Sequence, residues 1–434
     1  MLSIFKLNSI KIPHKKHTAD SHSQRMPIPK SVTIPMSMHI GAPAVPAVNV
    51  GDEVKVGQLI ANAGGAVSSP IYSGVSGKVK KIDEMLLSNG SKSPAIVIEC
   101  DMKQETVEFI PPVVETFEDF IKAASLSGVV GLGGAGFPLH IKLGIKDMSK
   151  LDYVIINCAE CEGYITSDTR TMLEKTDEFM DGIALIQRFY PNKKVIIGIE
   201  DNKKQCIDKL KPLCKAQNVE IKVLPSVYPT GGEKVLVYNI TGRMIPEGKL
   251  PLDVGAIVIN CTTLTCLQNY IRNGIPLYEK TVTVDGSAVN EPKNVIVPIG
   301  TMVSDVIEFC GGYKEEPKKI LYGGTMMGIS VPNDSVPILK NTNAILAFGK
   351  KEATLPKTTE CINCGRCVQH CPMKLMPTMI NIAYEHKDTQ KLAKHKVNIC
   401  MECGCCSFVC PANRPLVQTN KLAKALLRQQ AVKK

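Results

Sequence analysis

The sequence predicts a multidomain chain of the α/β plus β class with a helical unit near its end. Three observations predict this class. Short apolar runs alternate with glycine turns over residues 37–112, apolar strands alternate with helical segments over residues 113–264, and nine of the seventeen cysteines fall within residues 361–410. A length of 434 residues suits roughly three domains with substantial cores.

The composition argues against a nucleic-acid-binding, a membrane-spanning and a secreted protein. The net charge is +11, but the chain has no Trp, few aromatic residues and no basic cluster interleaved with them, so we expect no nucleic-acid binding. No apolar run approaches the ~18 to 20 residues of a membrane span. The first residues lack the apolar core of a signal peptide, and many cysteines without a disulfide context indicate a reducing compartment. We therefore expect a soluble or peripheral protein.

Residues 1–36 are rich in Lys, His and Pro and are expected to form an extended arm. His14, His17 and His22 are candidate metal ligands. Their irregular spacing, with lysines between them, favours a solvated arm instead.

Residues 37–112 are expected to form a small sandwich or barrel, because Gly-Asp and Gly-Lys turns recur at regular spacing. The phrases VGDEVKVGQLI and SSPIYSGVSGKV resemble the barrel-sandwich hammerhead of biotinyl and lipoyl carriers. Such carriers present a modifiable lysine at a hairpin tip, and the corresponding segment AGGAVSS has none. We interpret this unit as a structural module that shares the carrier fold.

A glycine loop follows a predicted helix at about residues 115–126. Gly131, Gly133 and Gly136 match G-x-G-x-x-G, in which glycines let the backbone approach a phosphate and donate N–H groups to it. The dinucleotide fingerprint requires a strand before this loop and a helix after it, whereas here a helix precedes it and Pro138 follows closely. A glycine-rich turn without a ligand is the alternative.

Polar side chains follow the apolar run YVIIN within residues 151–173, which predicts a parallel core strand. Such groups at the carboxyl end of a buried strand lie where α/β sheets bind ligands. They are Asn157, Glu160, Glu162, Asp168 and Arg170. Further strands are predicted within 195–200, 221–225 and 252–264, with a second glycine turn, YPTGGEKVL, at 228–236. Cys158 and Cys161 form a lone C-x2-C, which favours buried thiols over a metal site.

Residues 265–350 predict short strands around a helix. We expect this β module to act as a spacer, with a soluble-ligand site as the alternative. Met326 and Met327 within it are expected to fill a core.

Two cysteine runs within residues 351–415 carry the strongest chemical signal. CINCGRCVQHCP at 361–372 and CMECGCCSFVCP at 400–411 both contain C-x2-C-x2-C-x3-C-P, the bacterial pattern for a pair of [4Fe–4S] clusters in which the fourth cysteine ligates the other cluster. The pattern predicts two ligand sets, one of Cys361, Cys364, Cys367 and Cys410 and one of Cys400, Cys403, Cys406 and Cys371. Cys405 is surplus.

The proline after each fourth cysteine predicts that Cys371 and Cys410 lie at helix starts. Zinc knuckles and a disulfide framework are the alternatives to iron–sulfur clusters. Zinc requires neither the repeated x3-C-P nor two equal sets of four cysteines, and a disulfide scaffold is typical of short secreted chains.

The tail, residues 416–434, carries five basic residues and no acidic residue. Leu422, Ala425 and Leu426 can share one helix face, which predicts a basic amphipathic helix that docks on a membrane surface or an acidic partner. A helix packed on the cysteine-rich unit is the alternative.

Four segments ahead of the cysteine runs resemble a known family. GLGGAGFPLHIK, INCAECEGYITSD, YPTGGEKVLVYNITGR and LPLDVGAIVIN resemble the RnfC subunit of the Rnf electron-transport complex, and the resemblance extends from HKKHTAD at 14–20 to Pro411. The middle of the chain is also similar to the flavin subunit of respiratory complex I, and residues 265–350 resemble the β-grasp SLBB module. The implied architecture is a hammerhead, a Rossmann-like domain for FMN and NADH, an SLBB module and an α-helical ferredoxin domain.

The resemblance also implies a flavin site. The glycine loop and Lys142 would cradle the FMN phosphate, and Glu162 would lie near the nicotinamide as the catalytic residue. Asn157 and Glu160 would lie at the isoalloxazine ring. The full set of implied cofactor-binding residues is Gly131, Gly133, Gly136, Lys142, Asn157, Glu160, Gly232, Glu233 and Asn260.

Three positions depart from the family pattern. Gly163 replaces the usual Pro, Cys261 stands in INCTTL where Asn-Val-Gly-Thr is usual, and Thr325 replaces a common Pro. These departures bear on the nucleotide specificity more than on the fold. A paralogue of the family therefore stays an alternative.

The resemblance implies an NADH-linked oxidoreductase subunit, peripheral on the cytoplasmic side of a membrane complex, that exchanges electrons between NADH and two [4Fe–4S] clusters through FMN. The whole complex would transfer electrons from ferredoxin to NAD+ and transport ions through other subunits. Its partners would be those subunits and a ferredoxin or ferredoxin-like subunit. One alternative is a soluble paralogue that delivers NADH electrons to an amino-acid or corrinoid reductase, and another is a non-enzymatic iron–sulfur adaptor.

Overall fold

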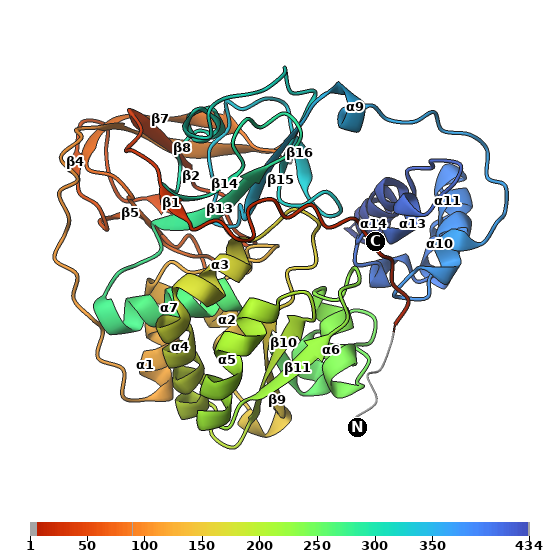
Figure 1. The fold of residues 1–434 in the computed structure, drawn as a ribbon, viewed down its shortest axis with the longest axis horizontal. Coiled ribbons are helices and arrows are strands. Elements are labelled where there is room, and N and C mark those ends of the chain that lie inside the picture. The colour runs from red at the N-terminus through yellow and green to blue at the C-terminus, as the bar shows by residue number, and fades with distance from the viewer. Residues whose placement is uncertain (1–6, 89, 433–434) are drawn as a thin grey trace.

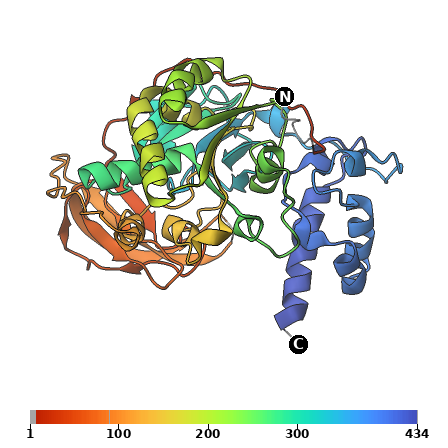
Figure 2. The same cartoon turned by 90° about the horizontal axis from the view of Figure 1, so that it is seen from below.

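The computed structural model describes residues 7–88 and 90–432, which form four units along the chain (Figure 1). Two β units and an α/β unit form one large body, and the helical unit with the cysteine runs stands at its side (Figure 1 and Figure 2). Among the described residues, no helix combines the length and the apolar composition needed to cross a membrane.

The first unit packs two small antiparallel sheets against each other, with the strand orders β2-β8-β7-β4 and β3-β5-β6. Its strands are β2 (Ser31–Pro35), β3 (Val45–Pro46), β4 (Glu53–Val54), β5 (Leu59–Asn62), β6 (Ile71–Tyr72), β7 (Gly77–Leu86) and β8 (Lys92–Cys100). Val32 and Ile34 of β2 are fully buried, because alternate strand residues face the same side. The arm expected over residues 1–36 therefore ends before Ser31.

The second unit is a four-stranded parallel sheet with the order β11-β10-β9-β12 and helices on both faces. Its strands are β9 (Tyr153–Cys158), β10 (Lys194–Glu200), β11 (Glu220–Leu224) and β12 (Ala256–Asn260). Val154 and Ile156 pack in the core of one face and Ile155 in the core of the other, as alternation along a strand requires. The carboxyl ends of all four strands therefore meet at one edge.

The last helix of this unit extends past residue 264, where the unit was expected to end. The helices of the unit are α1 (Phe117–Leu126), α2 (Leu139–Leu143), α3 (Ser167–Glu174), α4 (Thr176–Phe189), α5 (Lys204–Ala216), α6 (Glu233–Thr241) and α7 (Cys261–Asn273), with the short 3-10 helices η1 (Met148–Lys150) and η2 (Pro251–Val254). Helix α7 starts directly after β12, because the Asn260 side chain caps it by accepting from Thr263 N. The unit continues to Asn273 and does not end at residue 264.

The third unit is a six-stranded sheet with the order β1-β14-β13-β17-β15-β16. Its elements are β13 (Glu279–Asp285), β14 (Lys293–Pro298), α8 (Val303–Phe309), β15 (Lys319–Tyr322), β16 (Ile329–Val331) and β17 (Ala344–Phe348). The outermost strand, β1 (Gln24–Arg25), comes from the arm and pairs in parallel with β14.

The arm packs along the other units through a few buried residues, while its three histidines, His14, His17 and His22, are exposed, as the solvated-arm interpretation expects. Ile10 forms a bridge with Tyr228 and is buried, and Thr18 is fully buried. The candidate metal ligands of the arm do not share a site, because His17 lies 2.9 Å from Asp285 Oδ1, whereas His22 lies 3.2 Å from Glu174 Oε1.

The fourth unit is helical. It contains α9 (Lys350–Ala353), α10 (Arg366–Gln369), α11 (Pro377–Glu385), α12 (Thr389–Lys394), η3 (Val397–Ile399), α13 (Cys405–Phe408) and α14 (Leu416–Val432). The expectation that Cys371 and Cys410 start helices is wrong, because both lie in turns that follow the short helices α10 and α13.

The tail forms helix α14, which packs on the cysteine-rich unit, as the alternative interpretation of the tail predicts. It contacts α11 and α12 and buries Leu416 and Ala423 against the cysteine-rich unit. Of the apolar face predicted for docking, Leu426 is half-buried, whereas Leu422 is exposed.

Candidate functional site

The glycine loop contacts the turn between β12 and α7. Leu132 N donates to Thr263 Oγ1 at 2.9 Å. A Cβ added at Gly133 would lie 2.8 Å from Asn260 Nδ2, so the loop approaches the strand end closely only because this residue is glycine. Gly136 has a φ of 68°, in the left-handed region that favours glycine.

The same loop presents bare backbone to the surface. Gly133 and Gly134 are exposed, and a Cβ added at Gly134 would meet no atom within 4 Å. The amides of both residues donate no hydrogen bond to another described residue. Free N–H groups close to the start of α7 suit an anion, so the loop fits the phosphate of a nucleotide such as FMN.

Asn157 and Asn260 end neighbouring strands and are paired in register. Asn157 Nδ2 donates to Gly231 O at 2.9 Å, and Asn260 Nδ2 donates to Asp168 Oδ2 at 2.8 Å. Burial raises the pKa of Asp168. The two amides thus tie the ends of β9 and β12 to the second glycine turn and to the start of α3.

Glu160 caps helix α3. Its φ of 50° is left-handed, and its carboxylate accepts hydrogen bonds from Asp168 N at 2.6 Å and Thr169 Oγ1 at 2.6 Å. Two buried ammonium groups balance its charge, because Lys203 Nζ lies 3.3 Å and Lys16 Nζ 3.9 Å from Oε2. The carboxylate predicted to face the isoalloxazine ring is therefore engaged within the protein.

Lys16 of the arm holds the acidic loop in place. Its Nζ donates to the carbonyl oxygens of Glu160 at 3.0 Å, Glu162 at 3.0 Å and Ile165 at 2.5 Å. Burial, followed by the nearby charge of Lys203, lowers the pKa of Lys16 to about 8. The backbone around the expected active-site residues thus depends on a side chain of the arm.

Glu200 belongs to the same buried group. It ends β10 and is fully buried, and burial raises its pKa to about 7 against the opposing effect of Lys203 and Lys16. Its Oε1 has no hydrogen-bond partner in the described part of the chain.

Glu162 faces the SLBB module. Its carboxylate accepts from Met326 N at 3.2 Å and Met327 N at 3.0 Å, and burial raises its pKa. A Cβ added at Gly324 would lie 2.1 Å from Glu162 Cδ, so the turn can close over the carboxylate only because this residue is glycine. The Met326 side chain packs against an apolar cluster, as expected for core filler, whereas Met327 is exposed.

The two charged residues expected at the phosphate form an ion pair with each other. Lys142 Nζ lies 2.8 Å from Glu233 Oε1 and also donates to Val258 O at 3.0 Å. Glu233 is the first residue of α6, where a negative charge favours the helix dipole. Gly232, just before it, meets the fourth unit, because an added Cβ would lie 2.3 Å from Met401 Cε.

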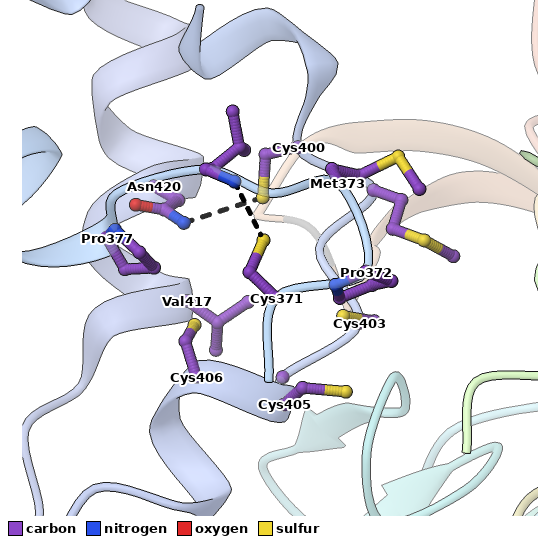
Figure 3. Close-up of a pocket in the computed structure, with 13 residues that line it drawn as sticks. Cys371, Pro372, Met373, Pro377, Cys400, Cys403, Cys405, Cys406, Val417 and Asn420 are labelled. Carbon is purple, nitrogen blue, oxygen red and sulfur yellow. Dashed lines mark hydrogen bonds between the residues drawn. The ribbon is translucent and has the colours of Figure 1, made fainter. Parts of the chain in front are cut away.

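Five cysteines from both runs line one pocket, and the four of them other than Cys405 are here termed the inner cysteine set (Figure 3). Its members are Cys371, Cys400, Cys403 and Cys406. Leu375 N donates to Cys371 Sγ at 3.3 Å, and Asn420 Nδ2 donates to Cys400 Sγ at 3.5 Å. The grouping matches one predicted ligand set, with Cys371 contributed by the other run. Ligation itself stays a prediction.

The outer cysteine set comprises Cys361, Cys364, Cys367 and Cys410, of which Cys367 shares an apolar cluster with Cys406 of the inner set. Cys367 and Cys410 pack with Leu416, whereas Cys361 and Cys364 are exposed. Cys405 points away from Cys371 and Cys400 in Figure 3 and packs with Ile10 and Tyr228, so it stays surplus to both sets. In residues 7–88 and 90–432, no three His, Cys, Asp or Glu side chains are placed to hold a single metal ion.

The inner set is the one that contacts the α/β unit. Tyr228 OH donates to Cys403 O at 2.7 Å, Met401 lies against Gly232, and Asn8 Nδ2 donates to Cys371 O at 3.2 Å. These contacts fix the pocket of the inner set beside the second glycine turn.

Several residues of the site are absent from the set predicted from sequence. Glu200 ends β10 and Lys203 follows it, at the same edge of the sheet as Asn157. Their position at a strand end was therefore sufficient to predict them as site residues. Lys16, Tyr228 and Met401 carry no local signal, because each acts through a contact with a segment more than 140 positions away.

Replacing Glu200 with Gln should change how stability depends on pH. A pKa raised to about 7 means that the folded protein binds this proton more tightly than the unfolded chain, so the stabilising contribution is full below pH 4.5 and is lost as the pH rises through 7. The Tm of Glu200→Gln relative to the unsubstituted protein should therefore rise between about pH 5 and about pH 8. Thermal unfolding measures this difference, with exposed Glu220→Gln as the control. A constant difference would contradict the assignment.

Four family models match the four units. The Nuo51 FMN-binding domain matches residues 124–269, the RnfC barrel sandwich hybrid domain residues 7–103, the SLBB domain residues 281–330 and the 4Fe-4S dicluster domain residues 360–414. These matches confirm the predicted fold class, the FMN domain and the pair of [4Fe–4S] clusters, and they exclude zinc knuckles and a disulfide framework.

A chain in the crystal structure of NAD+-reducing [NiFe]-hydrogenase in the H2-reduced state is similar in fold. The TM-score is 0.52 at 16% sequence identity, over 73% of this chain and 62% of that chain.

Curated relatives match over nearly the full length. The chain is 43% identical to the subunit designated C in the proton-translocating ferredoxin:NAD(+) oxidoreductase complex of Clostridium ljungdahlii, over 89% of this chain and 85% of the relative. It is 40% identical to the subunit of the same designation in the ion-translocating oxidoreductase complex of Rhodobacter capsulatus, over 97% and 82%. It is 39% identical to that of the Na(+)-translocating ferredoxin:NAD(+) oxidoreductase complex of Acetobacterium woodii, over 82% and 81%. The chain therefore belongs to the RnfC family of subunits of the ion-translocating oxidoreductase complexes.

Proposed function

We propose that this chain is the NAD(H)-reacting peripheral subunit of a membrane electron-transport complex. It exchanges electrons between NADH and two [4Fe–4S] clusters through FMN, within an overall transfer from ferredoxin to NAD+ that other subunits couple to ion transport. The names of the relatives support this reaction. The observation that carries the proposal is the position of the two cysteine sets, one against the FMN domain and one at the surface.

The residues of the α/β unit would hold FMN at the edge of the parallel sheet. The free amides of Gly133 and Gly134 would bind its phosphate, with Gly131 and Gly136 shaping the loop. FMN supplies a group that takes two electrons as hydride and passes them on singly. Asn157 and Asn260 keep the strand ends beside this loop, and the pair of Lys142 and Glu233 closes the site toward α6.

The cysteine sets define the order of transfer. The inner set lies beside the second glycine turn, so its cluster would exchange electrons with FMN first. The outer set, with Cys361 and Cys364 exposed, would then exchange electrons with the partner. We place the chain as a peripheral subunit on the cytoplasmic side, because its relatives belong to ion-translocating complexes that act on ferredoxin and NAD(+).

Two of the departures from the family pattern, Gly163 and Cys261, are explained by packing within the chain. A Cβ added at Gly163 would lie 2.6 Å from Pro13 O, so the arm requires glycine there. Cys261 is fully buried at the start of α7, where it packs in the core of the sheet. Thr325 lies in the turn that closes over Glu162.

Anaerobic titration of the purified protein with NADH tests the proposal. NADH should bleach the flavin absorbance and then generate the paramagnetic resonance signals of two interacting reduced clusters. Clusters that accept electrons from dithionite but not from NADH would refute the NADH-linked role. A protein that binds no flavin on anaerobic reconstitution would be an adaptor.

Replacing Glu162 with Gln should slow NADH oxidation and leave the flavin content unchanged. In Gln an NH2 donor replaces one carboxylate oxygen and would face the N–H donor of Met326 or Met327, so the loop at the site would shift. We expect a loss of roughly ten- to a hundredfold in the rate of flavin reduction, measured by stopped flow. Exposed Glu308→Gln is the control. Loss of flavin in Glu162→Gln would show that the residue supports cofactor binding instead.

Replacing Asn420 with Leu should make the potential of the inner cluster more negative. Its Nδ2 donates to Cys400 Sγ, and a hydrogen bond to a ligand sulfur stabilises the more negative, reduced cluster. Because Asn420 Oδ1 has no partner in the described chain, Leu leaves no new polar group unpaired. A redox titration followed by paramagnetic resonance measures the shift, with exposed Gln418→Leu as the control. An unchanged inner potential, or a shift of the outer cluster alone, would contradict the assignment of Cys400.

A further inference from the structure

The positive charge of the chain is concentrated in the cysteine-rich unit. Residues 351–434 contain 14 Lys and Arg against 5 Asp and Glu, so they carry +9 of the total +11. The other 350 residues carry only +2. A charge confined to one unit, standing at the side of the main body in Figure 1, is a local field and not a general means of solubility.

Only a minority of these basic residues form ion pairs within the unit. Lys424 pairs with Glu402, Arg414 with Glu385, and Lys391 with Asp388. Lys357, Arg366 and Lys374 are exposed and form no ion pair with any described residue.

Lys357 and Arg366 lie close to the outer set in the chain, whereas Lys374 follows Cys371 of the inner set and donates its amide to the carbonyl oxygen of that residue. Arg366 stands between Cys364 and Cys367. The carbonyl oxygen of Lys357 accepts from Asn413 Nδ2 at 3.2 Å, which holds this segment beside the turn after Cys410. Lys374 lies in the turn that leads into α11, whose Thr378 backbone contacts the Cys367 thiol.

Apolar side chains are exposed among these charges. Ile362 lies between two exposed cysteines and has 66% of its surface exposed, and Phe408 precedes Cys410 with 51% exposed. Met376 and Met379 are exposed around the first turn of α11. Apolar and flexible side chains within a basic rim are typical of a surface that is covered by a protein partner.

We propose that this surface, termed the outer docking face and comprising Cys361, Ile362, Lys357, Arg366, Lys374 and Met376, docks an acidic iron–sulfur protein. The proposal rests on the proposed function and names its redox partner surface. One electron would pass from the reduced cluster of the partner to the cluster of the outer set, so that the partner is oxidised and the outer cluster is reduced, and no proton or leaving group is involved. Opposite charges would orient the two proteins during encounter.

A protein partner fits this face better than a lipid surface. The one long basic helix of the described chain, α14, buries Leu416, Val417 and Ala423 within the unit, so most of its apolar side is not free to enter a membrane. The exposed cysteines also require an electron carrier within reach, which a lipid surface does not provide.

The test measures electron transfer from a two-[4Fe–4S] ferredoxin of net negative charge to the full-length protein with FMN and both clusters in place. The ferredoxin is reduced beforehand, and no NADH is added. Combined Lys357→Glu, Arg366→Glu and Lys374→Glu should lower the second-order rate constant at least about tenfold at low salt and remove its decrease with rising ionic strength. The control combines Lys78→Glu, Lys103→Glu and Lys146→Glu, three exposed residues without ion pairs in the main body, and should change the rate less than about twofold.

Equal effects of the two triple variants, or none from either, would overturn the docking face. So would a lost affinity for vesicles of equal phosphatidylglycerol and phosphatidylcholine with an unchanged rate, which would assign the face to lipid. If the first triple variant loses its clusters, two other measurements test the docking face. The rate constant of the unsubstituted protein should fall with rising ionic strength, and Lys357→Glu alone should lower the rate constant at low salt. The absence of both effects would overturn the docking face. Because this assay omits NADH, a protein that reacts with the ferredoxin but not with NADH would refute the proposed function and not the docking face.

Discussion

The ammonium of Lys16 is the group on which the site depends most. It is buried in the arm, and it supplies hydrogen bonds to three carbonyl oxygens of the acidic loop together with half of the charge that balances Glu160. Removing one partner of a buried ion pair leaves an uncompensated charge, at a cost of about 3–5 kcal/mol. The left-handed backbone at Glu160 and the cap of α3 both rely on this compensation.

The arm that carries Lys16 also contacts the SLBB module, the α/β unit and the cysteine-rich unit. It adds strand β1 to the SLBB sheet, bridges Tyr228 of the α/β unit and donates from Asn8 to the backbone of Cys371. Tyr228 in turn donates to the carbonyl oxygen of Cys403, and the SLBB turn that donates to the Glu162 carboxylate lies against Gly404. The distance between the FMN domain and the inner cysteine set is therefore fixed by contacts from three units, as electron transfer between fixed centres requires.

The local sequence predicted the fold class and the cofactors, whereas the contacts that hold the site residues in place form only in the folded chain. The cysteine spacing and glycine loops identified the fold class and both cofactors, because short loops around a cluster or a phosphate impose their own pattern. The helix starts expected at Cys371 and Cys410 failed, because a proline permits a helix start but does not impose one, and here each follows a turn. The partners of Glu160 and Glu162 could not be predicted, since Lys16, Lys203 and the amides of Met326 and Met327 reach them only in the folded chain.

The arm also sets the order in which the chain can fold. Its partners lie far downstream, as the separations of 146 positions between Lys16 and Glu162 and 363 between Asn8 and Cys371 show. Contacts of such high sequence separation form late, because the intervening loop must first be closed at an entropic cost. During synthesis the segment that holds Ile10 and Ile12 leaves the ribosome long before the surfaces that bury it, so this part of the arm reaches its final packing only after the cysteine-rich unit has been made. Final packing of the arm is in this way coupled to completion of the chain.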